Sequence, residues 1–291
     1  MAGEFDATVR VLVCQNCGAA LPPAQATGGQ ITCTYCHTVT MITARDDRPL
    51  GGGPVDEAQR MAGLWAQVGS AGLAVHQEVA GLMEGGRLPD ANLNAARQMW
   101  QATCQRQVAD PASAGDDLLW LTSALSDYYG IRGDATTGRA LWESIMDICH
   151  APRMQQYIRC SLSRNAAKAG DLAAAQGWLG PCDSQPPDLM SDSVYRLAYS
   201  VIMTLRGDFQ AVLNALGPRM DSIPLFFAPS VLICVVRANA VEKLGDVAGA
   251  TGQLGLLIQT DPNLKAMLPI LATTNAHLAL CPQSMPAALA R

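Results

Sequence analysis

The sequence predicts a mainly α protein, an α-solenoid of helical hairpins preceded by a small β module at the N-terminus. Three observations lead to this fold class. The dipeptide Gly-Asp recurs at intervals of 37 or 38 residues, and a fixed repeat of about 20 to 50 residues is typical of a solenoid. Apolar residues recur at helical spacing from Val55 onward. The first 44 residues, in contrast, contain runs rich in Val, Thr and Ile, as strands do.

Composition divides the chain into three zones. Residues 1–44 contain two strand-like runs, Ala7–Cys14 and His37–Thr43, and form the predicted β module. Residues 45–54 include prolines and three consecutive glycines, which disfavour a regular element, so this zone is predicted to be a flexible linker. Residues 55–291 form the predicted helical-repeat domain.

Two helices are predicted before the repeats begin. The apolar residues between Met61 and Met83 recur mostly at steps of three and four, which predicts one helix that ends at Gly85-Gly86. Asp90 is predicted to be the N-cap of a second helix that ends near Asp110-Pro111. The inward-facing residues of this second helix are predicted to be Leu93, Trp100, Cys104 and Val108.

Each repeat is predicted to contain two helices joined by a Gly-Asp pair. The glycine is expected to end the first helix (helix A) in a left-handed conformation, and the aspartate to cap the second (helix B). One hairpin cannot bury its own apolar face, so neighbouring hairpins are expected to stack. The pairs are Gly133-Asp134, Gly170-Asp171, Gly207-Asp208 and Gly245-Asp246.

Residues 117–281 resemble tetratricopeptide-like helical repeats. The fourth unit, VRANAVEKLGDVAGATGQLGLLIQTDPNL, has a helix A, a Gly-Asp turn, a helix B and a closing Asp-Pro-Asn. The unit is longer than the ~34 residues usual in that family, and a helical bundle with chance Gly-Asp turns is the alternative. The resemblance implies that the A helices line a concave groove that holds a protein or peptide partner.

Four residues are candidates for contacting that partner. Arg159 and Arg196 each lie 11 residues before a Gly-Asp pair, so they are expected to stack on successive A helices. Tyr195 and Tyr199 lie on the same helix as Arg196, and Arg and Tyr are enriched at interface hot spots. The alternative is a solvated ladder that contacts no partner.

Four cysteines cluster near the N-terminus with the spacing Cys14-x2-Cys17-x15-Cys33-x2-Cys36. Such pairs can form a redox device, disulfides or a metal site. Each CxxC can place two thiolates on a tight turn at the tip of a hairpin, and two such turns can give a tetrahedral ion four sulfur ligands. A redox CxxC would need one pair in a βαβ context, and disulfides conflict with a reducing cytoplasm.

The text CQNCGAALPP…ITCTYC is similar to a zinc ribbon. In that family all four cysteines bind one structural Zn²⁺, and the resemblance carries this role to Cys14, Cys17, Cys33 and Cys36. His37 stands where many ribbons have glycine and is an alternative ligand, although four thiolates already complete the shell. A module of about 40 residues with few large apolar groups is expected to depend on the metal for folding.

No motif argues for an enzyme. A GxSxG, P-loop or GxGxxG sequence is not found, and four thiolates leave no open position on the metal for catalysis. The six other cysteines share no metal spacing and are expected to be buried structural residues. They are Cys104, Cys149, Cys160, Cys182, Cys234 and Cys281.

The charge balance argues against nucleic-acid binding. The chain has 20 basic and 25 acidic residues, and only Lys168, Lys243 and Lys265 are lysines. No basic stripe of the kind that binds phosphate backbones is visible. The N-terminus lacks the pattern of a secretory signal, and the most apolar run, Ile223–Val236, is too short to span a bilayer. We therefore expect a cytoplasmic protein without a membrane span.

Together these features predict a non-enzymatic protein-protein interaction scaffold or adaptor, with a zinc ribbon tethered to a helical-repeat domain. A nucleic-acid- or transcription-associated zinc-ribbon factor is the first alternative, and the charge disfavours it. A redox-sensitive zinc chaperone is the second, and it would need accessible thiolates of low pKa. Homo-oligomerisation is also considered, because the sequence is poor in charge and contains the apolar pair Phe226-Phe227.

Overall fold

The computed structural model describes residues 12–13, 20–21, 30–32, 39–41, 57–68, 70, 72–84, 87–111, 114–217, 219 and 222–290. Over these residues the protein is mainly helical, as the sequence predicts. In this part of the chain, every helix is too short or too polar to reach across a lipid bilayer. The helices are α1 (Glu57–Gln67), α2 (Gln77–Ala80), the 3-10 helix η2 (Asp90–Asn92), α3 (Leu93–Ala109), α4 (Gly115–Ile131), α5 (Ala135–Met146), α6 (Pro152–Lys168), α7 (Leu172–Leu179), α8 (Leu189–Arg206), α9 (Phe209–Leu216), α10 (Phe227–Lys243), α11 (Val247–Thr260), α12 (Leu264–Thr274), the 3-10 helix η3 (Ala276–Leu278) and α13 (Ser284–Leu289).

Four short strands form two separate antiparallel pairs near the N-terminus. Strand β1 (Leu12–Val13) pairs with β2 (Ala20–Leu21), with Leu12 opposite Leu21. Strand β3 (Gln30–Thr32) pairs with β4 (Val39–Met41), with Ile31 opposite Thr40. β1 and β4 fall within the two runs that the sequence predicts to be extended.

Four helical hairpins are closed by the four Gly-Asp turns. Each of these glycines has a positive φ, between 75° and 104°, and each aspartate carboxylate accepts a hydrogen bond from the backbone N–H three residues later. The aspartate N–H donates to the carbonyl five residues earlier, and the glycine N–H to the carbonyl three residues earlier, which is a Schellman arrangement. The predicted turn chemistry is confirmed at all four positions.

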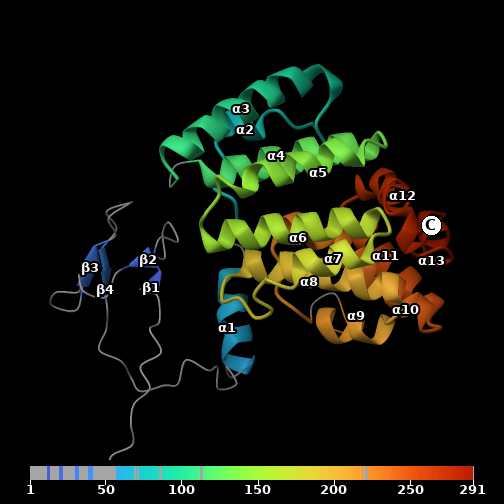
Figure 1. Cartoon of the computed structure of the whole chain (residues 1–291). Helices are drawn as coiled ribbons and strands as arrows, with labels where there is room; N and C mark the ends of the chain where they lie inside the picture. Colours follow the sequence, from blue (N-terminus) through green and yellow to red (C-terminus); the bar gives the residue numbers. More distant parts are fainter. Residues whose placement is uncertain are drawn as a thin grey trace, which may run out of the picture.

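The hairpins α4–α5, α6–α7, α8–α9 and α10–α11 pack against one another in chain order. Among the A helices, α4 contacts α6, α6 contacts α8 and α8 contacts α10. Figure 1 shows the hairpins lying one below another, from α4 in green to α10 in orange. One apolar cluster extends from Leu64 in α1 to Ala288 in α13, so successive hairpins share a core.

The C-terminal segment folds back across the A helices. α12 contacts α4, and η3 contacts both α6 and α8. Two buried residues of α10 hold the chain that follows: Asn239 Oδ1 accepts a hydrogen bond from the Cys281 N–H at 2.8 Å, and Glu242 Oε2 accepts one from the Ser284 N–H at 2.8 Å. The inner face of the A helices is therefore partly covered by the protein's own C-terminal residues.

The prediction of one continuous helix between Met61 and Met83 is wrong. α1 ends at Gln67, and residues 72–76 are not helical. Two carboxylates at the start of α4 bind this segment instead: Asp116 Oδ2 accepts from the Ala74 N–H at 2.7 Å, and Asp117 Oδ1 from the His76 N–H at 2.9 Å. These bonds satisfy backbone donors that a helix would otherwise satisfy internally.

Asp90 and Val108 also differ from their predicted roles. Asp90 is the first residue of η2 rather than an N-cap, and its carboxylate accepts a hydrogen bond from the Tyr128 hydroxyl at 2.9 Å. Val108 is 65% exposed, because α3 packs on α4 and this residue lies away from that contact. The end of α3 at Ala109 agrees with the prediction.

Candidate functional site

Arg196, one of the four predicted contact residues, is bonded within the protein. Its Nε donates to Asp192 Oδ2 at 2.6 Å, and its Nη1 donates to the carbonyl of Ala215 in α9. The guanidinium therefore joins helix A to helix B of its own hairpin. Its side chain is 14% exposed, which leaves little of it for a partner.

The other three predicted contact residues lie near Cys182. The rings of Tyr195 and Tyr199 are stacked, with centroids 6.3 Å apart. The hydrogen bond from Cys160 lowers the pKa of Cys182, and the nearby charge of Arg159 lowers it further. Burial raises the pKa of Tyr195, and the nearby charge of Cys182 raises it further. Arg159 and the two tyrosines therefore lie in one region, whereas Arg196 is bonded to Asp192 and to the Ala215 carbonyl.

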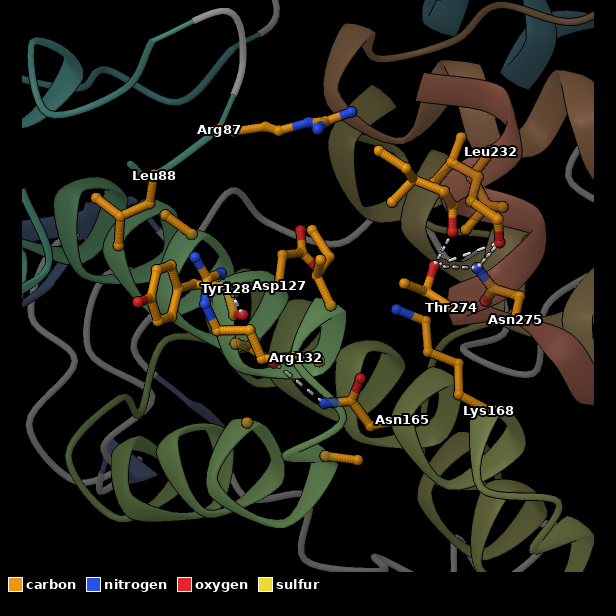
Figure 2. Close-up of a pocket in the computed structure, with 18 of the residues that line it drawn as sticks. Arg87, Leu88, Asp127, Tyr128, Arg132, Asn165, Lys168, Leu232, Thr274 and Asn275 are labelled. Atoms are coloured by element: carbon orange, nitrogen blue, oxygen red, sulfur yellow. Dashed lines mark hydrogen bonds between the residues drawn. The ribbon is translucent and has the colours of Figure 1, made fainter. Parts of the chain in front are cut away.

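A cavity of about 830 Å³ lies between the A helices and the C-terminal segment, and none of those four residues lines it. In Figure 2, Tyr128 and Arg132 lie on one side of it, and Lys168 of α6 lies beside Thr274 and Asn275 on the other. Its volume falls within the ~300–1,000 Å³ typical of ligand sites. The lining residues are Met83, Glu84, Arg87, Leu88, Pro89, Ala124, Ser126, Asp127, Tyr128, Gly130, Ile131, Arg132, Ala135, Gly138, Arg164, Asn165, Lys168, Ala169, Leu197, Leu232, Met267, Ile270, Leu271, Thr274 and Asn275.

The charged residues of the cavity are mainly basic, although the whole chain has a net charge of -5. Figure 2 shows charged side chains from three separate elements around the same opening. One of them is already paired, because Arg132 donates to the Asp90 carboxylate and lies 3.6 Å from the centre of the Tyr128 ring. The basic residues are Arg87, Arg132, Arg164 and Lys168, and the acidic residues are Glu84 and Asp127.

Three polar groups on the cavity wall have no hydrogen-bond partner in the described part of the chain. Arg164 Nε and Asn275 Oδ1 are both buried and unpaired. Asn275 cannot easily turn, because its Nδ2 donates to the Leu271 carbonyl at 2.7 Å. Lys168 has neither a hydrogen bond nor an ion pair within the same described residues. Buried polar groups are nearly always paired, so the two buried atoms and the half-buried Lys168 have bonding capacity left for a group that enters the cavity.

Lys168 lies in an environment that disfavours its own charge. Burial lowers the pKa of Lys168 below its ordinary value of 10.5, and the nearby charge of Arg164 lowers it further. Arg164 precedes Lys168 by four residues on α6, so the two cations share one helix face. Asp127 on α4 acts in the opposite direction, and its effect is larger than that of Arg164. A bound anion would offset the loss of hydration at Lys168 and give Arg164 Nε an acceptor.

The predicted zinc ligands Cys14, Cys17, Cys33 and Cys36 lie outside the described residues, as do His37 and the linker 45–54. The strands that surround them in sequence are described: β1 and β2 flank the first CxxC, and β3 and β4 flank the second. Elsewhere in the described residues, no group of three or more His, Cys, Asp or Glu side chains is placed to hold a metal ion.

Sequence reasoning does not find the cavity, because its walls come from segments up to 192 positions apart, from Met83 to Asn275. The available signal is Lys168, one of three lysines in the chain, four residues after Arg164 on a helix A. Nothing in the sequence shows that the C-terminal segment returns to face these two residues.

Comparison of the chain with protein-family models, with curated proteins and with solved structures finds no match in any of the three. The cavity and the N-terminal cysteine pattern are therefore the features of the chain that bear on its function.

Proposed function

We propose that this chain is a non-enzymatic interaction scaffold of the cytoplasm. In this proposal a tetratricopeptide-like α-solenoid holds an acidic segment of a partner protein, and a zinc ribbon tethered by residues 45–54 makes a second contact. The observation that carries the proposal is the basic cavity on the A helices, in which Arg164, Lys168 and Asn275 present unpaired polar groups.

The chemistry of the cavity favours an acidic peptide over a small inorganic anion. Apolar side chains such as Leu88, Ile131, Leu232 and Met267 form much of the wall, and they suit the side chains that flank a carboxylate. A peptide also offers backbone N–H donors for Asn275 Oδ1. An inorganic anion would fill only a small part of about 830 Å³.

The same cavity argues against the nucleic-acid alternative. Nucleic-acid binding relies on basic residues that follow the phosphate backbone over a long stretch of surface. Here the basic residues converge in one hollow, and the chain as a whole is acidic.

The zinc ribbon is supported by the cysteine spacing and by the two strand pairs that flank the CxxC sequences. Cys14, Cys17, Cys33 and Cys36 would hold one structural Zn²⁺ with a closed shell of four thiolates. A ribbon on a flexible linker would raise the effective concentration of a second binding site for the same partner.

A binding experiment on the full chain tests the cavity. Fluorescein-labelled hexaglutamate, hexaglutamine and hexathymidylate are titrated, and fluorescence anisotropy is measured. We expect hexaglutamate to bind roughly tenfold or more tightly than hexaglutamine, because charge-assisted hydrogen bonds to Arg164 and Lys168 are lost with the neutral peptide. Equal affinity for the two peptides would contradict the proposal, and preferential binding of hexathymidylate would favour the nucleic-acid alternative.

Affinity capture from the native cell then assigns partners to the two modules. Partners lost with Cys33→Ser belong to the ribbon, and partners lost with Lys168→Met belong to the cavity. Arg159→Ala tests whether the surface around Arg159, Tyr195 and Tyr199 adds a third contact. Retention of every partner in all variants would refute the scaffold proposal.

A further inference from the structure

Two free cysteines of the repeats lie in direct contact. Cys160 on α6 and Cys182 in the segment between α7 and α8 have their sulfur atoms 3.9 Å apart, with the Cys160 thiol donating to Cys182. A disulfide requires about 2.05 Å, so the two sulfur atoms must approach by roughly 2 Å. Cys182 lies outside a helix, and rotation of its side chain can provide most of that movement.

The segment that contains Cys182 is held against α6 by its neighbour. Gln156 of α6 donates through Nε2 to the Asp183 carbonyl at 2.9 Å, and its Oε1 accepts from the Asp183 N–H at 2.9 Å. Gln156 lies one helical turn before Cys160. The backbone next to Cys182 is therefore already fixed beside its partner, which lowers the entropic cost of bringing the sulfurs together.

The two thiols differ in the way that a reactive pair requires. Cys160 is fully buried and burial raises its pKa, whereas Cys182 is only half-buried. The hydrogen bond from Cys160 lowers the pKa of Cys182, and the charge of Arg159 lowers it further. The thiolate is the reactive form, so Cys182 is the nucleophile and Cys160 the resolving thiol.

The remaining cysteines of the described residues lack these properties. Burial raises the pKa of Cys104 to about 11, of Cys149 to about 12 and of Cys281 to about 12. Burial also raises the pKa of Cys234. Cys104 is half-buried, as Cys182 is, but no thiol donates to it, and it therefore serves as an internal comparison.

We propose that Cys160 and Cys182 form a reversible disulfide when the protein meets hydrogen peroxide. The Cys182 thiolate attacks one peroxide oxygen, the O–O bond breaks, and the departing hydroxide takes a proton to become water. This leaves a sulfenic acid on Cys182. The Cys160 sulfur then attacks the Cys182 sulfur, the S–O bond breaks, and the hydroxyl leaves as water with the Cys160 proton. Two thiols lose two electrons and two protons, and the peroxide is reduced to two waters.

The disulfide would join α6 to the connection that leads into α8. Arg159 directly precedes Cys160 in the sequence. Tyr195 lies near both sulfur atoms, because its pKa is raised first by burial and then by the charges of Cys160 and Cys182. Oxidation would therefore act on the surface formed by Arg159, Tyr195 and Tyr199. It does not involve the cavity residues, so this inference is independent of the proposed function.

Peptide mapping of the full chain tests the inference. The reduced protein is treated with hydrogen peroxide, denatured, alkylated with N-ethylmaleimide and digested with trypsin. Cleavage after Arg159, Arg164 and Lys168 places the two cysteines on separate peptides. We expect a disulfide-linked pair of peptides whose mass lacks both thiol hydrogens. Dithiothreitol should separate the two peptides, and Cys182→Ser should abolish the linked pair. Cys104 should be recovered as an alkylated thiol. In Cys160→Ser, dimedone should trap a sulfenic acid on Cys182.

Two results would overturn the inference. One is recovery of both Cys160 and Cys182 as alkylated thiols after peroxide treatment that oxidises other cysteines of the same sample. The other is oxidation of Cys182 and Cys104 at equal rates without a linked peptide. Neither result depends on whether a variant folds, because both are measured on the wild-type chain.

Discussion

Arg60 and Asp192 form a buried ion pair across 132 positions of sequence, with Arg60 Nη1 2.7 Å from Asp192 Oδ1. The pair joins α1 to α8. The Asp192 side chain is 1% exposed and also accepts from Arg196, while Arg60 binds Glu57 as well. These bonds fix the first helix after the predicted linker onto the middle of the repeat array.

Replacement of the buried carboxylate should destabilise the helical domain strongly. Asp192→Asn removes the negative charge that Arg60 and Arg196 share and replaces one of its two acceptor oxygens by an NH2 donor, and breaking a buried pair costs about 3–5 kcal/mol. We expect a loss of about 3 kcal/mol in the free energy of unfolding, because Arg60 keeps Glu57. Urea denaturation followed by circular dichroism measures it. The exposed residue Asp147 gives the matched control, since Asp147→Asn should change stability by less than about 0.5 kcal/mol.

The Gly-Asp turns allow a test of backbone conformation in which the added side chain contacts no neighbouring residue. Gly207 has a φ of 75°, and a Cβ built on it meets nothing within 4 Å. Gly207→Ala should therefore destabilise by about 1–2 kcal/mol through the left-handed backbone alone. Gly252 lies inside α11 with equally open surroundings, and Gly252→Ala should stabilise by up to about 1 kcal/mol. A shift of the thermal midpoint in the same direction for both would contradict the repeat geometry.

Removal of the metal should affect the N-terminal module and spare the helices. The purified chain is expected to contain one Zn²⁺, measured by elemental analysis, and Cys33→Ser or a strong chelator should release it. The helical circular-dichroism signal should remain, because residues 57–290 have their own core. Cys104→Ser is the control and should retain zinc. Loss of the whole helical signal with the metal would show that the two parts do not fold independently.

The parts of the fold that depend on local chemistry are the parts that the sequence predicts well. A glycine with a positive φ and an aspartate that caps the next helix are read directly from the Gly-Asp pairs, and all four turns form as expected. The predicted helix between Met61 and Met83 fails for the opposite reason. Its interruption depends on Asp116 and Asp117, which bind the backbone from more than 40 positions away.

The candidate site was even less accessible to sequence reasoning. Arg159 and Arg196 share a position in the repeat, but Arg196 is bonded to Asp192 and to the Ala215 carbonyl. Equal positions in a repeat do not ensure equal bonding, because Asp192 lies four residues before Arg196 on α8, whereas Gln155 occupies the corresponding position before Arg159. The unpaired Asn275 faces Lys168 only after the C-terminal segment has crossed the A helices, and that crossing depends on Asn239 and Glu242.

The pH dependence of stability should show the desolvated charge of Lys168. Burial lowers the pKa of Lys168 in the folded state below its ordinary value of 10.5, which the unfolded chain keeps. At a pH between the folded-state pKa and 10.5, the unfolded chain therefore holds more protons than the folded chain. Stability from this group therefore rises as the pH approaches 10.5. Lys168→Met should remove this dependence, and its stability advantage over wild type should shrink from neutral to alkaline pH. If the difference in the free energy of unfolding between Lys168→Met and wild type stayed constant with pH, the lowered pKa of Lys168 would be contradicted.

A paired measurement on Lys168→Met tests the central claim most directly. Hexaglutamate affinity by anisotropy and the thermal midpoint are measured for wild type, for Lys168→Met and for the exposed control Lys265→Met. If Lys168 serves binding at the expense of stability, Lys168→Met should bind hexaglutamate roughly tenfold more weakly than wild type and should unfold at a higher temperature. Lys265→Met should change neither quantity. Unchanged affinity in Lys168→Met, or a lower midpoint together with weaker binding, would contradict the claim that this cavity is a binding site for an acidic segment.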